Sequence, residues 1–200
     1  MGRRIGIFGG TFDPVHIAHL LVASEVRWRL GLDVVLLMVA GDPWQKSTRE
    51  GMAPADDRLA VVAAAVEDLD GLEASSLEID RGGATYTADT LAQLHATEPD
   101  AELFLIIGAD VARLLHTWER PDEVRFAATL VVVARPGSPA APLDQLRRQG
   151  WTIEEVAVPA FDVSSSEVRA RLAEGRPIDV LVPPAAVREI VQRGRYARTG

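Results

Sequence analysis

Cysteine is absent from this 200-residue sequence, and lysine occurs only once, as Lys46, beside 20 arginines. A chain without cysteine forms no disulfide bonds and no thiolate zinc site, which is typical of a cytoplasmic protein. Long apolar runs are also missing, because the longest, over residues 34–40, is far shorter than the roughly 20 residues that cross a bilayer. The first residues lack the apolar stretch and cleavage site of a secretory signal. We therefore expect a cytoplasmic protein without a transmembrane helix.

Acidic residues outnumber basic ones by 29 to 21, which gives a formal net charge of −8. This excess argues against binding to nucleic acids or to anionic membranes, because both are themselves negatively charged. Hydrophobic residues make up 48% and charged residues 25% of the chain, as in globular proteins and unlike disordered ones. The length predicts a single domain over residues 1–200. We expect its closing helices at about residues 164–193.

Short apolar runs that predict strands alternate along the chain with segments of helical periodicity. We expect strands at residues 5–8, 34–40, 72–79, 103–107, 129–134 and 153–158. Helices are expected at residues 17–30, 54–69, 87–96, 111–115, 122–126, 143–149, 166–173 and 185–193. The alternation predicts an α/β fold, a Rossmann-like open and mostly parallel sheet with helices on both faces. Ligands of such sheets bind beyond the carboxyl ends of the strands, here in the loops after Phe8, Ala40, Ile107 and Ala134.

The loop after the first strand contains Gly9 and Gly10 and leads into a helix that starts near residue 15. Glycines allow close backbone approach to a phosphate, and the helix directs free amides and its positive end at the same place. His16 and His19, three residues apart, share one face of its first turn. One histidine capping the helix and the other packed in the core is the structural alternative. A metal pair is another, although zinc normally needs a third ligand. The loop fits a dinucleotide fingerprint poorly and lacks a Walker lysine.

Residues 11–19 resemble the signature Gly-x-Phe-Asp-Pro-x-His-x-Gly-His of the nucleotidyltransferase α/β-phosphodiesterase superfamily. Ala18 replaces the usual glycine, which narrows the room for a phosphate at that residue. The resemblance implies an HxGH-type nucleotidyltransferase fold and catalytic roles for His16 and His19. It also implies that ATP contacts Gly9 and Gly10, just before this segment, and Thr11 and Phe12 at its start.

A second motif lies about 150 residues later, where residues 163–169 run from an apolar segment into a helix. Ser165 or Ser166 could cap this helix, with its free amides facing an anion. An ordinary capped helix is the structural alternative. The segment resembles the superfamily motif Ile-Ser-Ser-Thr-x-Ile-Arg, and this resemblance implies that Ser165, Ser166 and Arg169 bind the β,γ end of ATP.

Within the superfamily, residues 84–91 resemble the Ser-Tyr-Thr-x-Asp-Thr-Leu motif of bacterial nicotinate mononucleotide adenylyltransferases. The resemblance implies that Tyr86 and Thr87 hold the mononucleotide, with Thr87 at the pyridine carboxylate. Hydroxyls and amides at a helix start donate to an anion, which favours nicotinate over neutral nicotinamide. Capping of a helix by Thr85 is the structural alternative.

Further segments match this family in chain order and imply the remaining site residues. Lys46 falls at the lysine of its Pro-x-x-Lys loop, which contacts substrate phosphate. Trp118 falls at the tryptophan that stacks on the pyridine ring. Gly108 and Asp110 lie in an Ile-Gly-x-Asp turn that receives the nucleotide, and Arg135 lies in an Arg-Pro-Gly segment at the mononucleotide.

The resemblance implies transfer of the adenylyl group of ATP to nicotinate mononucleotide, giving nicotinate adenine dinucleotide and pyrophosphate by in-line attack. It implies Mg²⁺ carried by ATP, since the sequence offers no clear carboxylate cage. A homo-oligomer is left open. Two alternatives remain, a pantetheine phosphate adenylyltransferase and a noncatalytic nucleotide-sensing module. The first usually has threonine at the first histidine and a shorter chain, and the intact histidine pair argues against the second.

Overall fold

The computed structural model describes residues 2–42, 51–134 and 141–194. Six strands in these segments form one sheet, and each neighbouring pair is parallel. The sheet has the order β3-β2-β1-β4-β5-β6. In chain order its strands are β1 (Arg4–Gly10), β2 (Val34–Val39), β3 (Leu72–Ser75), β4 (Glu102–Gly108), β5 (Thr129–Ala134) and β6 (Ile153–Ala157). The α/β fold expected from the sequence is therefore confirmed.

Side chains of the central strands alternate between two apolar cores, one on each face of the sheet. Ile5 and Ile7 of β1 belong to one core, and Val35 and Leu37 of β2 belong to the other. The continuous apolar runs in the sequence reflect this burial on both faces.

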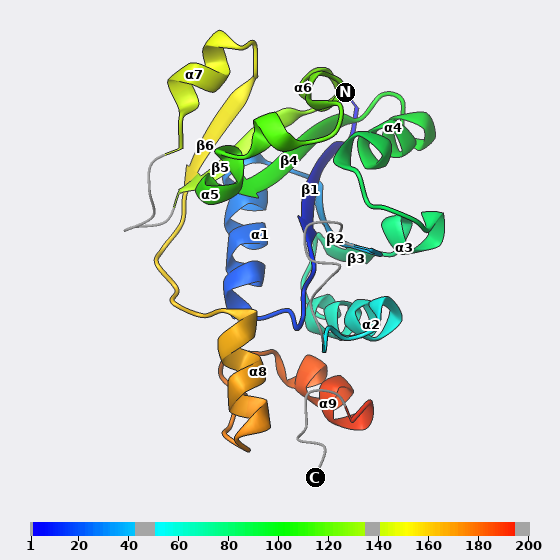
Figure 1. Cartoon of the computed structure of the whole chain (residues 1–200), viewed down its shortest axis with the longest axis vertical. Coiled ribbons are helices and arrows are strands. Elements are labelled where there is room, and N and C mark those ends of the chain that lie inside the picture. The colour runs from blue at the N-terminus through cyan, green and yellow to red at the C-terminus, as the bar shows by residue number, and fades with distance from the viewer. Residues whose placement is uncertain (1, 43–50, 135–140, 195–200) are drawn as a thin grey trace.

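Helices cover both faces of the sheet (Figure 1), as predicted. One core is completed by α1 (Ile17–Leu30), α2 (Ala55–Val66), α8 (Ser165–Ala173) and α9 (Pro184–Gln192). The other is completed by α4 (Thr87–Thr97), α5 (Ala109–Ala112), the 3₁₀ turn η1 (Leu115–Thr117), α6 (Pro121–Ala127) and α7 (Leu143–Arg148). Among the described residues, no helix is long and apolar enough to cross a membrane.

Three expected elements differ from the structure. The strand expected over residues 72–79 ends at Ser75 and is followed by the short helix α3 (Leu77–Arg81). Serine side chains explain the change, because Ser75 Oγ accepts from the Leu77 N–H and Ser76 Oγ donates to Asp80. Such local bonds compete with a strand ladder. The helix expected to reach residue 69 ends at Val66, and the one expected at residues 111–115 is split into α5 and η1.

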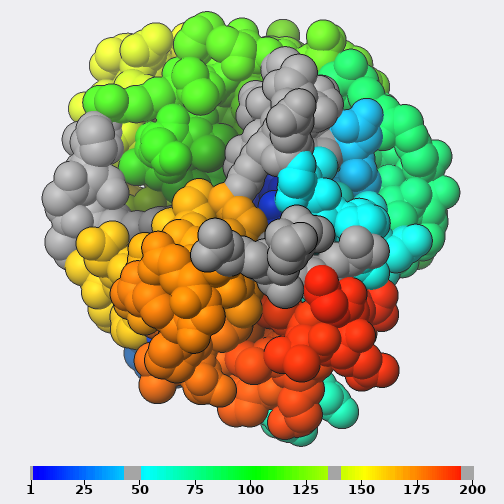
Figure 2. Space-filling model, turned by 60° about the horizontal axis from the view of Figure 1, so that its bottom comes forward, coloured from blue at the N-terminus to red at the C-terminus, as the bar shows by residue number. Residues whose placement is uncertain are grey.

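The C-terminal helices return to the amino-terminal half of the chain. Figure 2 shows α8 and α9, in orange and red, beside one another, and α9 packs against α2. Arg193 bridges to Asp57 of α2 at 2.6 Å, and the Ile17 N–H donates to the Leu181 carbonyl at 2.9 Å. Residues at the two ends of the chain are thus brought together around the start of α1.

Candidate active site

A cavity of about 600 Å³ lies beyond the carboxyl ends of β1 and β4. The strand order reverses between these two strands: β2 and β3 follow β1 on one side of the sheet, and β5 and β6 follow β4 on the other. Loops leave the sheet in opposite directions at such a point, and the space between them receives ligands in this fold. The segments after Phe8 and Ile107 contribute to the wall, as predicted, and Ala40 lines it as well. Residues 43–50 and 135–140, which follow Ala40 and Ala134, lie outside the described residues. The volume suits a nucleotide-sized ligand.

The glycine loop, which comprises the last two residues of β1 and the turn that follows them (residues 9–14), contributes one wall of the cavity. Gly9 and Gly10 pair with β2, so β1 extends beyond the strand expected at residues 5–8. A Cβ built on Gly9 meets no atom within 4 Å, whereas one on Gly10 would lie 2.8 Å from the Phe12 ring. Phe12 has a positive φ of 47° and is buried. Its ring makes edge contacts with Phe8 at 5.8 Å and His19 at 5.1 Å between centroids. Gly10 therefore leaves the space in which Phe12 orients His19.

The two histidines expected to act together are stacked at the start of α1. Their ring centroids are 3.7 Å apart with an interplanar angle of 30°. The His16 N–H donates to Nδ1 of His19 at 3.2 Å. Because Nδ1 accepts this bond, the proton of a neutral His19 is assigned to Nε2. Both histidines line the cavity.

Helix α8 locks the glycine loop from the C-terminal side. Ser165 Oγ donates to the Pro14 carbonyl at 2.9 Å, and the Arg169 guanidinium donates to the Asp13 carbonyl and to Ser166 Oγ. The cap of α8 is Ser164, which accepts from the Glu167 N–H at 3.2 Å. The expectation that Ser165 or Ser166 caps this helix is therefore wrong, because the Ser165 hydroxyl is used by the loop instead.

The opposite end of the cavity is formed by the start of α4 and the segment after η1. Tyr86, Thr87 and Trp118 line it. Arg120 connects the two segments, because its guanidinium contacts Asp89 in the first turn of α4 at 2.6 Å. The hydrogen bond to Asp89 raises the pKa of Arg120, which keeps the guanidinium charged. The ion pair thus links the segment that follows η1, which carries Trp118, to the start of α4.

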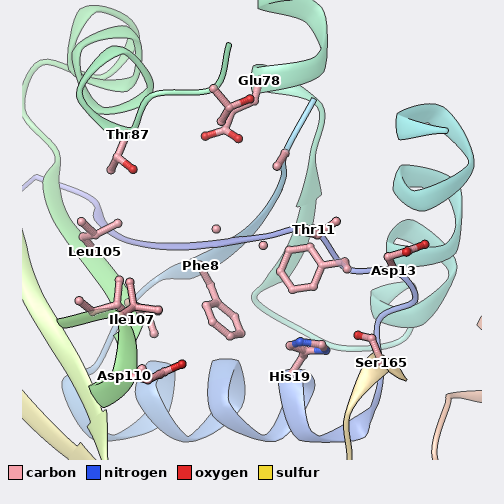
Figure 3. Close-up of a pocket in the computed structure, with 18 of the residues that line it drawn as sticks. Phe8, Thr11, Asp13, His19, Glu78, Thr87, Leu105, Ile107, Asp110 and Ser165 are labelled. Atoms are coloured by element: carbon pink, nitrogen blue, oxygen red, sulfur yellow. The ribbon is translucent and has the colours of Figure 1, made fainter. Parts of the chain in front are cut away.

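Most of the residues predicted from the sequence meet in this one cavity (Figure 3). Those that line it are Gly9, Gly10, Thr11, Phe12, His16, His19, Tyr86, Thr87, Gly108, Asp110, Trp118, Ser165 and Ser166. Lys46 and Arg135 lie outside the described residues. Arg169 does not line the cavity and holds the loop from behind, so its contact with ATP stays a prediction.

Sequence reasoning missed two buried charged residues at this site. Arg58 of α2 is 1% exposed and donates to three segments, namely to Thr11 at 2.7 Å, to Ala40 at 2.7 Å and to Ala53 at 3.0 Å, each at a backbone carbonyl. Its place on the buried face of α2 was visible in the sequence, since it precedes the apolar positions by helical spacing. Glu78 lines the cavity from α3, which the sequence had suggested to be a strand.

Comparison with known proteins identifies the family. Residues 7–171 match the family model described as cytidylyltransferase-like. A protein of Saccharopolyspora erythraea named probable nicotinate-nucleotide adenylyltransferase is 43% identical over 97% of this chain and 90% of its own length. One of the same name from Streptomyces coelicolor is 44% identical over 94% of this chain and 98% of its own. The chain belongs to the nicotinate-nucleotide adenylyltransferase family.

Solved structures of remote sequence support the fold of this family. The nicotinic acid mononucleotide adenylyltransferase of Plasmodium falciparum, solved in complex with NaAD, superposes with a TM-score of 0.77. It is 17% identical and covers 97% of both chains. A putative nicotinate-nucleotide adenylyltransferase from Vibrio parahaemolyticus gives a TM-score of 0.68 at 21% identity over 97% of this chain and 95% of its own.

The glycine loop offers a matched pair of variants. We expect Gly10→Ala to lower the free energy of unfolding by about 1–3 kcal/mol, because the new methyl group displaces the packed Phe12 ring. Gly9→Ala adds the same methyl group into open space and should unfold within about 1 kcal/mol of the wild type. Urea titration of both variants measures the difference, and equal losses would contradict this account of Gly10.

Replacing Arg58 should destabilise the fold more than replacing Arg193, the arginine that contacts α2 from α9's C-terminal end. Arg58→Met leaves buried carbonyls of three segments without their donor, and we expect a loss of about 3 kcal/mol or more in the free energy of unfolding. Arg193→Met removes a partly exposed ion pair to the same helix and serves as the control, with an expected loss of about 1 kcal/mol or less. Similar unfolding midpoints in guanidinium chloride for the two variants would refute the role of Arg58.

Proposed function

We propose that this protein transfers the adenylyl group of ATP to nicotinate mononucleotide, forming nicotinate adenine dinucleotide and pyrophosphate in NAD biosynthesis. The observation that carries the proposal is the stacked pair of His16 and His19 at the start of α1, inside the cavity. Membership of the adenylyltransferase family supports the reaction class. The opposite end of the cavity supplies an aromatic ring and hydroxyl groups, which suit a pyridine that carries a carboxylate.

The reaction requires no protein nucleophile. A phosphate oxygen of the mononucleotide attacks the α-phosphorus of ATP, the bond from that phosphorus to the β-bridging oxygen breaks, and pyrophosphate leaves with the bonding electrons. Catalysis then consists of aligning two phosphates and stabilising the charge that develops on the transferring group and the leaving pyrophosphate.

No lysine or arginine side chain is among the described residues that line the cavity, so its positive potential must come from other groups. The amino-terminal ends of α1 and α8 both border the cavity, through His16 and Ser165. The dipoles of both helices favour negative charge at these ends. In α1 the Ile17 and His19 N–H groups are already bonded to the Leu181 and His16 carbonyls, so this helix contributes chiefly through its dipole. We propose that the Nε2–H of His19 donates a hydrogen bond to the phosphate groups on which negative charge develops in the transition state.

The preference for nicotinate rests on hydrogen-bond donors at the start of α4. Thr85 Oγ1 is buried and has no hydrogen-bond partner among the described residues. Tyr86 occupies the N-cap position of α4. Thr85 therefore does not cap this helix, and the structural alternative given for it is wrong. Thr85 and Thr87 line the cavity together, and their hydroxyls can donate to the pyridine carboxylate. A neutral carboxamide accepts more weakly.

The proposal retains further predictions from the sequence. Lys46 and Arg135 would bind the mononucleotide, and Arg169, Ser165 and Ser166 would serve the β,γ end of ATP. Mg²⁺ bound to ATP supplies additional charge neutralisation at the phosphates. The described residues contain no group of three or more His, Cys, Asp or Glu side chains that could hold an ion. Mg²⁺ usually keeps several water ligands and binds substrate phosphates, so phosphate oxygens and water would supply most of its ligands. The cytoplasmic location expected from the cysteine-free sequence completes the proposal.

His19→Ala tests the catalytic assignment. The variant loses a donor aimed at the transferring phosphates, and we expect kcat to fall by about 10²- to 10³-fold while the unfolding midpoint changes little. His95→Ala, at an exposed position of α4, is the matched control and should keep wild-type turnover. Pyrophosphate release gives both rates. Near-normal turnover of purified His19→Ala would refute the assignment.

Substrate choice is tested by offering three phosphates in parallel. With ATP present, nicotinate mononucleotide should release pyrophosphate with a kcat/KM at least tenfold above that of nicotinamide mononucleotide, because only the former presents an anion to the threonine donors. Phosphopantetheine should give no release above background. Turnover with phosphopantetheine alone would assign the protein to the pantetheine branch, and ATP binding without any turnover would favour a nucleotide sensor.

A further inference from the structure

Glu78 is a buried carboxylate in the cavity wall with no role in the reaction derived above. It belongs to α3, is 6% exposed and lines the cavity. Figure 3 shows its carboxylate directed into the cavity, between Thr87 toward one side and Thr11 toward the other. Thr87 marks the pyridine end of the mononucleotide site, and Thr11 belongs to the loop that receives phosphates. Glu78 therefore faces the middle of a bound mononucleotide.

The position of Glu78 is tightly determined. Thr90 Oγ1 donates to Glu78 Oε1 at 2.7 Å, and Arg81 donates to the same Thr90 oxygen at 3.1 Å. Because Thr90 has a single hydroxyl proton, the guanidinium leaves that proton directed at the carboxylate. On the backbone side, a Cβ on Gly41 would lie 3.0 Å from the Glu78 carbonyl, so the end of β2 fits closely under α3.

Keeping a carboxylate at this depth opposes folding. Burial raises the pKa of Glu78, and the Thr90 hydroxyl and the Arg81 charge offset this only in part. A raised pKa means that the folded protein binds more protons than the unfolded chain between the two pKa values. Stability is thus lost as the pH rises through that window, and the ionised group is a cost to the fold above it. Costly groups of this kind are concentrated at functional sites.

The chemistry of nicotinate mononucleotide restricts what this carboxylate can contact. An ionised carboxylate only accepts hydrogen bonds. The phosphate and the pyridine carboxylate are acceptors too, and the ribose hydroxyls are the donors that the molecule offers. The ribose lies between the pyridine and the phosphate, which is where Glu78 lies between Thr87 and Thr11. Figure 3 places Asp110 on the other side of the cavity, where it is suited to the second nucleotide.

We infer that Glu78 binds the ribose hydroxyls of the mononucleotide and thereby positions its phosphate for attack. The inference rests on the proposed function, because it assumes that nicotinate mononucleotide is the acceptor. Thr90 and Arg81 are positioning residues, since they orient the Glu78 carboxylate and do not line the cavity.

Glu78→Gln is the deciding variant. Its amide oxygen can still accept from Thr90, but the atom turned to the ribose changes from an acceptor to an N–H₂ donor. We expect the KM for nicotinate mononucleotide to rise about tenfold or more, as for loss of a hydrogen bond to a charged group, while the KM for ATP stays within about twofold. Glu67→Gln, the same change at an exposed position beside α2, is the control and should leave all constants unchanged.

Deoxy substrates locate the contact. With the wild type, 2′-deoxy or 3′-deoxy nicotinate mononucleotide should show a KM about tenfold higher than the ribonucleotide. With Glu78→Gln the same analogue should show no further increase, because the contact is already lost. If Glu78→Gln raised the KM for the deoxy analogue as much as the KM for the ribonucleotide, the ribose contact would be overturned. If the KM of Glu78→Gln for nicotinate mononucleotide stayed within about twofold of the wild-type value, any contact of Glu78 with this substrate would be overturned.

Thermal unfolding separates binding from structure. At neutral pH we expect Glu78→Gln to unfold at or above the wild-type midpoint, since the neutral amide removes the cost of the buried charge. A clearly lower midpoint together with a raised KM for ATP would make Glu78 a structural residue and overturn the inference. Wild-type enzyme that does not adenylate nicotinate mononucleotide at all would instead refute the proposed function, and this is seen before any variant is made.

Discussion

Two arginine side chains hold the glycine loop by its backbone carbonyls, and the site depends on this restraint. Arg58 of α2 donates to the Thr11 carbonyl, and Arg169 of α8 donates to the Asp13 carbonyl. Between them lie Phe12, in a left-handed conformation, and the turn that leads to His16. A loop rich in glycine has many conformations of its own, so these contacts select the one that places the two imidazoles in the cavity.

The same restraint joins parts of the fold that are far apart in sequence. Arg58 also binds the carbonyls of Ala40 and Ala53, which lie before and after the long loop that follows β2. The Ala53 N–H in turn donates to the Asp13 carboxylate at 3.3 Å. Hydrogen bonds therefore join the loop after β1, the two described ends of the loop after β2 and the start of α8. Because the parallel strands deliver these loops to one edge of the sheet, these bonds form where the ligand cavity lies.

An acidic protein that handles anionic substrates has to confine its positive potential to the site. The net charge of −8 is spread over the chain, whereas the start of α1, the start of α8 and the histidine pair border the cavity. Backbone amides carry no net charge, so they attract phosphate without attracting nucleic acid over the whole surface. Acidic side chains in the wall, such as Glu78 and Asp110, then suit the hydroxyl groups of the nucleotides rather than their phosphates.

Much of the fold could be predicted from the sequence, because the signals were local. Residues 17–30 were expected as a helix and form α1 over that range, and the apolar runs became the buried strands. The error at residues 72–79 came from serine side chains that bond the nearby backbone, an effect that hydrophobic periodicity does not register. Lys46 and Arg135 were assigned from motifs alone and lie outside the described residues, so their roles stay predictions.

The sequence by itself determined the fold class, the histidine pair and most of the residues that line the cavity, since each belongs to a short motif. Only the tertiary structure decided how charged groups are used. Arg169, whose predicted contact with ATP stays a prediction, also bonds the Asp13 carbonyl from a helix that follows about 150 residues later. Arg58 and Glu78 acquire their partners through packing of α2 and α3 against the sheet. A charged side chain shows its type in the sequence, but its partners and its burial exist only once distant segments are in contact.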